Sequence, residues 1–500
     1  MNRHVILVML LLTMVPLGLR AQVVDSPFIT LWDTELPASE EVQVKGNPVN
    51  KSDDHSIRFP IIGANMVVEY QAEDAPDKTA WVAVPGGPHS AELGSSMQIV
   101  FPGKGRYYVR VLPQGISGYC GWEAGVWSNT PYGDVKRLVR IVSWGSVLWA
   151  EDGLKGAFRN SENLLSLPYQ DPEFPSAVLI PQGLRGSLEN LFQQCRKLSV
   201  PRESMNGWDV SQVTNLDSTF AGCEKFNGDL SKWNVGNVTS MRSTFYGCDV
   251  FNANLSEWNV GRVVRMDDML HGCYVFSSDI SRWNVAQVAN MDQLFYYCWA
   301  FNADISKWNV ARVTTMNRMF YGCKIFNANL SRWDVSNVED MGFMFWGCEA
   351  FNADLSLWNV GKVASIGGMF VRCKAFNYDC ITSWVPRSLE RGHMFSDAIT
   401  PAAWSRILKA WGAIADRLPL NAKVGAECKH FKSANAAIAQ LNGRGWEILD
   451  GGEMDGVIFR YDANGGVFAG GKTTWDDKAI AGRQGVLKRI ENYHCSPCRF

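Results

Sequence analysis

The sequence lacks any strong imbalance of charge. Its 500 residues include 48 lysines and arginines against 50 aspartates and glutamates, which gives a formal net charge of -2. This balance supplies no electrostatic reason to expect nucleic acid or an anionic membrane as a partner. Histidine is scarce as well, with only 7 in the chain. No HExxH, GxSxG or P-loop motif occurs, so we predict a protein without catalytic residues, metal or cofactor.

Long apolar runs are missing beyond the N-terminus. Residues 1–21 are typical of a signal peptide, with a basic start at Arg3, an apolar run over 5–19 and Ala21 before the cleavage point. That run is too short and too interrupted for a good membrane span, and no later stretch is apolar enough. We therefore expect a mature chain that has no membrane span and is secreted or held at the outer cell surface.

What the sequence does contain is a regular repeat. Tryptophan recurs every 25 residues from Trp208 to Trp358, and each unit can be written FNADLSxWNVxxVTxMxxMFxGCxx. A lone unit of this kind cannot bury its apolar side, whereas stacked units bury a continuous core. The tryptophan and cysteine columns are therefore interpreted as core. For the cysteines, disulfides or metal are the less favoured alternatives.

The spacing inside a unit predicts one strand and one helical turn. In Leu230–Val235 the apolar residues take the first, fourth and sixth places, as in the LxxLxL strand of a leucine-rich repeat. In Met241, Phe245 and Cys248 the steps are four and three, as on one face of a helix. We predict an α/β solenoid of the leucine-rich-repeat type over residues 136–399, with regular coils at 207–376.

The repeat resembles the BspA-like leucine-rich repeat of bacterial surface proteins in its W-[DN]-V, V-T-x-M and M-F-x-x-C segments. The resemblance implies non-enzymatic adhesion to host or neighbouring-cell proteins. The expected partner is thus an extracellular protein or matrix ligand. Two other functions stay open, namely a secreted hydrolase and a purely structural surface-layer or spacer protein.

Columns that vary between units form the candidate binding surface. One basic column is expected to face outward on the concave side of the predicted strand, and a second basic column also faces outward. An aromatic row follows each Met-Phe pair, with His271 in it, and such a row is a candidate adhesive surface. Solvated charges and half-buried rings that merely complete the coil are an equally good interpretation. The candidate basic residues are Lys232, Arg282, Lys307, Arg332, Arg262, Arg312 and Lys362, and the candidate aromatic row is Tyr246, Tyr296, Tyr321 and Trp346.

Two columns of Asn and Asp are interpreted as structural. The column after each tryptophan, such as Asn234, is expected to form hydrogen bonds along the stack. The column that contains Asp229, Asp279, Asp304 and Asp354 favours a turn role over a calcium site, because Asn254 and Asn329 interrupt it.

The flanking segments predict further modules. Residues 23–135 carry short alternating runs between turn residues, which indicate a small β-sandwich-like domain. Residues 400–452 contain two amphipathic helices, the second with Ser433 as N-cap, and are expected to cap the solenoid. The segment 457–468 resembles the start of a Listeria–Bacteroides (internalin B-type) repeat, which implies a partial β-grasp module over 457–490 before a tail at 491–500.

Overall fold

The structure is a computed structural model that describes residues 27–38, 42–44, 47–49, 52–91, 97–113, 119–122, 134–145, 154–174, 177, 181, 184–385, 395, 399–426, 428–462 and 474–480. It divides into two compact units, unit 1 (Met1–Val313) and unit 2 (Thr314–Phe500). The predicted signal peptide and the tail at 491–500 lie outside the described residues. Within those residues, no helix has the length and apolar character needed to cross a membrane.

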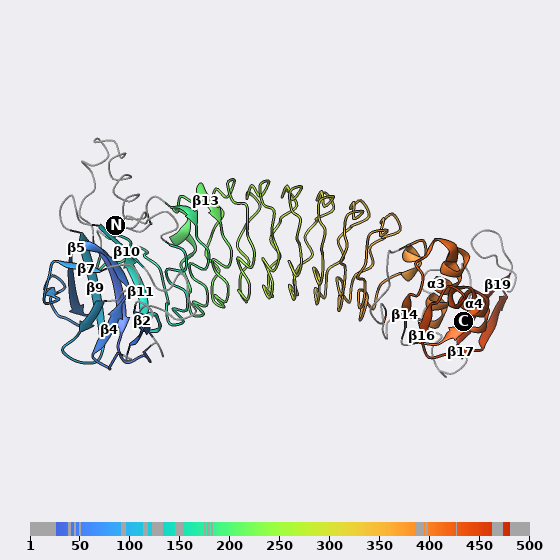
Figure 1. Cartoon of the computed structure of the whole chain (residues 1–500), viewed down its shortest axis with the longest axis horizontal. Helices are drawn as coiled ribbons and strands as arrows, with labels where there is room; N and C mark the ends of the chain where they lie inside the picture. The colour runs from blue at the N-terminus through green and yellow to red at the C-terminus, as the bar shows by residue number, and fades with distance from the viewer. Residues whose placement is uncertain are drawn as a thin grey trace. The chain divides into compact units, whose positions relative to one another are not determined.

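Unit 1 begins with an antiparallel sheet of seven strands, drawn in blue to cyan in Figure 1. Its main order is β10-β5-β9-β1-β11, and β6 and β7 also pair with β5. Two short pairs, β2–β3 and β4–β8, accompany it. The elements are β1 Phe28–Asp33, β2 Val42–Val44, β3 Asn47–Val49, β4 Ser56–Phe59, β5 Ile61–Ala72, β6 Val82–Ala83, β7 His89–Ala91, β8 Met97–Val100, β9 Arg106–Pro113, β10 Tyr119–Trp122, the 3₁₀ turn η1 Val135–Arg137 and β11 Leu138–Ser143.

The sheet is covered on both faces. Successive side chains of a strand point to opposite sides, and all six residues of β1 are buried. On one side Leu31 and Tyr108 pack together, with Phe174 against them. On the other side the Trp32 ring lies 5.6 Å from the Phe59 ring of β4. In its described residues, unit 1 thus has one large sheet with the β4–β8 pair against it, in place of two comparable sheets.

Successive 25-residue coils follow the sheet in unit 1 (Figure 1). Parallel bridges join one coil to the next, for example between Ser240 and Arg265. Backbone amides alternate between two kinds of partner. The Phe245 amide donates to the Met269 carbonyl of the following coil at 2.9 Å, whereas the Cys248 amide closes a local turn on Phe245 at 3.0 Å. The regular elements of this segment are β12 Arg185–Ser187, the 3₁₀ helix η2 Arg202–Met205 and β13 Gln212–Asn215.

The predicted α/β solenoid of the leucine-rich-repeat type is wrong. The segment expected to be a strand, Leu230–Val235, forms a turn and irregular backbone, and the expected helical turn at Met241–Cys248 is a succession of turns. Residues 207–376, all of them described, contain no helix, and their only strand is β13. The physical reason is that each coil has left-handed residues where a right-handed helix would have to pass, such as Ser243 with φ 53° and Gly247 with φ 66°. Described elements elsewhere are mostly small sheets with few helices.

Unit 2 contains further coils and a mixed C-terminal part. Parallel bridges join Thr315 to Asp340 and Asp340 to Ser365. The strands pair as β14–β16 and β15–β17 in parallel and as β18–β19 antiparallel. The elements are η3 Tyr378–Ile381, α3 Pro401–Ala413, η4 Ala415–Arg417, β14 Lys423–Gly425, β15 His430–Phe431, η5 Lys432–Ala434, α4 Asn435–Asn442, β16 Glu447–Leu449, β17 Glu453–Met454, β18 Gly456–Asp462 and β19 Thr474–Ile480.

The two helices expected after the coils are confirmed as α3 and α4. Thr400 caps α3, because its hydroxyl oxygen accepts a hydrogen bond from the Ala403 amide at 3.2 Å. The predicted cap of α4 is wrong: Ser433 lies inside η5, and the residue before α4 is Ala434, which has no side-chain acceptor. Much of the predicted β-grasp module, including residues 463–473, lies outside the described residues, so that assignment stays a prediction.

Candidate functional site

The tryptophan and cysteine columns are buried, as predicted, and they also join the coils. The Trp258 ring N–H donates to the Leu230 carbonyl of the preceding coil at 3.0 Å. The Cys248 thiol donates to the Phe220 carbonyl of the preceding coil at 3.1 Å. The cysteines of this column, from Cys195 to Cys373, are free thiols, and burial raises the pKa of Cys248 well above its usual value. The sequence pattern had indicated core packing but not these two ladders of hydrogen bonds.

The columns of Asn and Asp stabilise turns. The Asp279 carboxylate accepts from the Ser281 amide at 2.9 Å, which confirms the predicted turn role of that column. The prediction for the other column was wrong, because Asn234 accepts from Gly236 within its own coil at 3.2 Å instead of bonding along the stack. A third column does bond along the stack: Asn227 accepts from the Asn252 amide at 2.9 Å. No group of three or more metal-binding side chains occurs in the described part of the chain.

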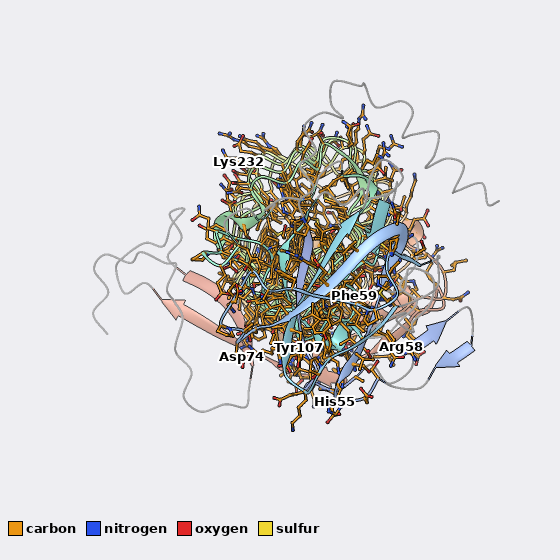
Figure 2. All side chains as sticks on the ribbon, turned by 90° about the vertical axis from the view of Figure 1, so that its left-hand side faces the viewer. His55, Arg58, Phe59, Asp74, Tyr107 and Lys232 are labelled. Atoms are coloured by element: carbon orange, nitrogen blue, oxygen red, sulfur yellow. The ribbon has the colours of Figure 1, made fainter. Side chains whose placement is uncertain are left out.

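The first basic column is exposed, but it does not lie on a strand. Lys232 occupies a turn closed by the Trp233 amide and the Leu230 carbonyl at 3.0 Å, and Figure 2 shows it at the outer rim of the coils. The bridges between coils lie elsewhere, at Ser240 and its equivalents, so the predicted position on a concave strand face was wrong. Lys307 of unit 1 and Arg332 of unit 2 are exposed as well.

Most cations of these columns already have a partner within the protein. Arg282 lies 3.5 Å from Glu257 of the preceding coil in a pair that is largely exposed and therefore contributes little to stability. The second basic column alternates with amides every 25 residues, a pattern that the sequence contained and our prediction missed. Each of its cations donates to an amide oxygen of the preceding coil: Arg262 to Asn237 at 2.8 Å, Arg312 to Gln287 at 2.7 Å and Lys362 to Asn337 at 2.6 Å.

The predicted aromatic row forms stacked rings on the surface of each unit. In unit 1 the His271 ring lies 4.3 Å from both Tyr246 and Tyr296. The His271 ring is also 3.0 Å from the Asp268 carboxylate. In unit 2 the rings of Tyr321 and Trp346 stack at 4.2 Å. Tyr246 is 40% exposed, and the other rings of the row are half-buried.

A second aromatic row in unit 1 was missed. Tyr274 and Trp299 follow His271 and Tyr296 by three residues, and their rings stack at 4.3 Å. Trp299 is 42% exposed. Tyr297 stands where most coils have glycine, with φ 58°, and its ring lies 4.6 Å from Tyr296. We call these six side chains the aromatic surface: Tyr246, His271, Tyr274, Tyr296, Tyr297 and Trp299.

Unit 2 contains a buried polar cluster around Asp450, and we considered whether it could be the active site of an enzyme. The Asp450 carboxylate accepts from the Trp404 ring N–H and lies within hydrogen-bond distance of His430 Nδ1, both at 2.8 Å. Cys428 is nearby, but burial and the Asp450 charge raise the pKa of its thiol to about 12. A thiol with a raised pKa is a poor nucleophile. The Asp450 group joins α3 to β15 and does not activate the cysteine.

The repeats have a counterpart among known protein families. Residues 186–305 and 290–404 each match the family described as "Mycoplasma protein of unknown function, DUF285". The two matches together span less than half of the chain. No curated protein matches the sequence, and no solved structure matches the fold. Over its coils the chain is therefore similar to a mycoplasma family of unknown function, and these matches do not confirm the BspA-like resemblance.

Proposed function

We propose that this protein is an exported, non-enzymatic binding protein whose aromatic surface adheres to an extracellular or matrix protein. Export rests on the signal-peptide pattern of residues 1–21, and adhesion agrees with the resemblance of the repeats to BspA-like surface proteins. Placement at the outer cell surface or in the medium follows from the same two observations.

The observation that carries the proposal is the pair of aromatic rows in unit 1. Single exposed apolar residues are ordinary, whereas a contiguous exposed group marks an interaction site. Next to the rings, Val250 is 39% exposed and Val275 is 45% exposed. Aromatic residues also contribute more binding energy at protein interfaces than most other types. The rings are held by their stacking and by coils joined through backbone hydrogen bonds, so we expect little side-chain entropy to be lost on binding.

The basic columns support adhesion less well. Arg262 and Arg312 donate to amides of the neighbouring coil, and a partner would have to replace those bonds. Lys232 and Lys307 are exposed on long flexible side chains, which lose entropy when they are fixed. We therefore place the main contact on the aromatic surface and leave the basic columns a secondary role.

Binding of the full chain to a panel of immobilised matrix proteins tests the proposal. We expect the double variant Tyr274→Ala, Trp299→Ala to weaken binding at least tenfold. The quadruple variant Lys232→Ala, Arg282→Ala, Lys307→Ala, Arg332→Ala should weaken it less than threefold. Tyr169→Ala, at an exposed tyrosine outside the surface, is the matched control. Loss of binding in the quadruple variant alone would show that the basic column is the contact surface.

A further inference from the structure

The aromatic surface begins abruptly at the coil that contains Tyr246. One coil earlier, the column of Tyr246 holds Ala221, which is 4% exposed and carries only a methyl group. The neighbouring column changes in a similar way, from Glu224 and Asp249 to Tyr274. Each column thus passes from a small or acidic residue to aromatic ones within unit 1.

Tyr246 has one covered ring face. Its stacking partner in the described residues is His271, at 4.3 Å in the next coil. On the side of the preceding coil, its own column offers only the Ala221 methyl group. Tyr246 is 40% exposed, and in the described residues His271 is the one ring that stacks on it. An accessible face of an electron-rich ring attracts cations.

Two carboxylates, Glu224 and Asp249, stand in the column that follows the Tyr246 column by three residues. Burial and the charge of Glu224 raise the pKa of Asp249, while Lys225 opposes the effect. Asp249 directly precedes Tyr274 in this column, whose next two rings, Tyr274 and Trp299, stack at 4.3 Å, and burial together with the charge of Asp249 raises the pKa of Tyr274. Asp249 forms no ion pair in the described part of unit 1, and Glu224 has only the loose pair with Arg196 at 3.5 Å. A cation brought next to Asp249 would relieve the repulsion between the two carboxylates.

Unit 2 shows how a cation fits the same aromatic column. There the Arg372 guanidinium lies over the Trp346 ring at 4.8 Å, and Trp346 stacks on Tyr321. Arg372 occupies the column that is glycine in most coils, with φ 61°, and belongs to the coil after Trp346. No cation of the described residues stands over Tyr246 in unit 1.

We propose that the Tyr246 end of the aromatic surface binds a cationic segment of the partner protein, with an arginine or lysine side chain on the open face of Tyr246 and its charge next to Asp249 and Glu224. This inference rests on the proposed function and specifies the chemistry of its partner. The negative charge of the two carboxylates disfavours an anionic membrane or a nucleic acid at this place. Arginine suits the site better than lysine, because its planar guanidinium stacks on a ring and also pairs with a carboxylate.

A fluorescein-labelled Gly-Ser peptide with three arginines tests the inference on the full chain by fluorescence polarisation. We expect Asp249→Asn and Glu224→Gln each to weaken binding about threefold and the double variant about tenfold. Tyr246→Leu should weaken binding about fivefold and Tyr246→Phe should not, because phenylalanine keeps the ring face. The matched control Glu257→Gln removes an exposed carboxylate from another column and should leave binding unchanged.

Three results would overturn the inference. One is equal loss of peptide affinity in Glu257→Gln and Asp249→Asn, which would show general attraction of charge. Another is tight binding of the same peptide with glutamines in place of arginines. The third is binding of anionic phosphatidylserine vesicles as tightly as the arginine peptide. If the matrix-protein panel binds and loses affinity in Tyr274→Ala, Trp299→Ala but not in Asp249→Asn, Glu224→Gln, only this inference fails and the proposed function stands.

Discussion

Hydrogen bonds from the tryptophan rings should contribute measurably to the stability of the coils, and two tryptophans allow a direct comparison. The rings of Trp258 and Trp208 are 3% and 2% exposed. Trp258 donates its ring N–H to the Leu230 carbonyl at 3.0 Å, whereas the ring N–H of Trp208 is buried without a partner. Replacing each by phenylalanine removes a similar apolar area but a different polar interaction.

The expected difference in the free energy of unfolding follows from what each substitution does to the ring N–H. Trp258→Phe loses a hydrogen bond worth about 0.5–1.5 kcal/mol, since Leu230 keeps the bond from the Trp233 amide as its other partner. Trp208→Phe removes an unsatisfied buried donor, which by itself relieves about 1–3 kcal/mol. The Trp258 variant should therefore be less stable than the Trp208 variant by at least about 1.5 kcal/mol, roughly a tenfold change in the unfolding equilibrium.

Urea unfolding of the full chain, followed by fluorescence and by circular dichroism, measures this difference. Because repeat proteins can unfold in parts, we would compare midpoints only where both probes agree and the slope with urea is unchanged. Trp283→Phe is the control for position, because Trp283 makes the equivalent bond to Leu255 at 2.9 Å. If all three variants lose equal stability, ring hydrogen bonding is not what distinguishes these columns.

Three further predictions concern the turns, the cysteines and the C-terminal helices. Hydrogen bonds from Ser306 lower the pKa of Asp304 below its usual 3.8. The stability that the Asp304 carboxylate contributes is therefore present above pH 3.8 and is lost as the pH falls through the lowered pKa. The variant Asp304→Asn should keep the turn and remove that part of the pH dependence of the urea midpoint. Burial raises the pKa of the Cys298 thiol, so iodoacetamide at pH 8 should label it only after unfolding, as mass spectrometry would show, and labelling of the native protein would contradict this. In Gly412→Ala the new Cβ would lie 2.4 Å from the Ala437 Cβ, so α3 and α4 must separate and stability should fall by about 1–3 kcal/mol; an unchanged melting temperature would refute that close approach.

The sequence predicted which residues fill the coils, because a core column repeats every 25 residues regardless of the backbone path. The sequence did not predict the backbone path of the coils. Apolar spacings of four and three occur on a helix face, but two consecutive turns produce the same spacing. At Ser243 the left-handed φ of 53° is carried by a residue that is not glycine, so the sequence gives no warning of it. The helix α3 was predictable because its apolar residues recur with the helical period of 3.6 over thirteen residues.

The candidate site likewise has a part that the sequence predicted and a part that only the structure shows. The sequence by itself determined the repeat and the row that contains Tyr246, since these depend on one column at a time, and it predicts the export signal from composition alone. Only the tertiary structure decided that Arg262 is committed to Asn237 and that Tyr274 stacks on Trp299 beside the first row. These are contacts between coils, and the distance between two coils is set by backbone hydrogen bonds that leave no mark on the side-chain pattern.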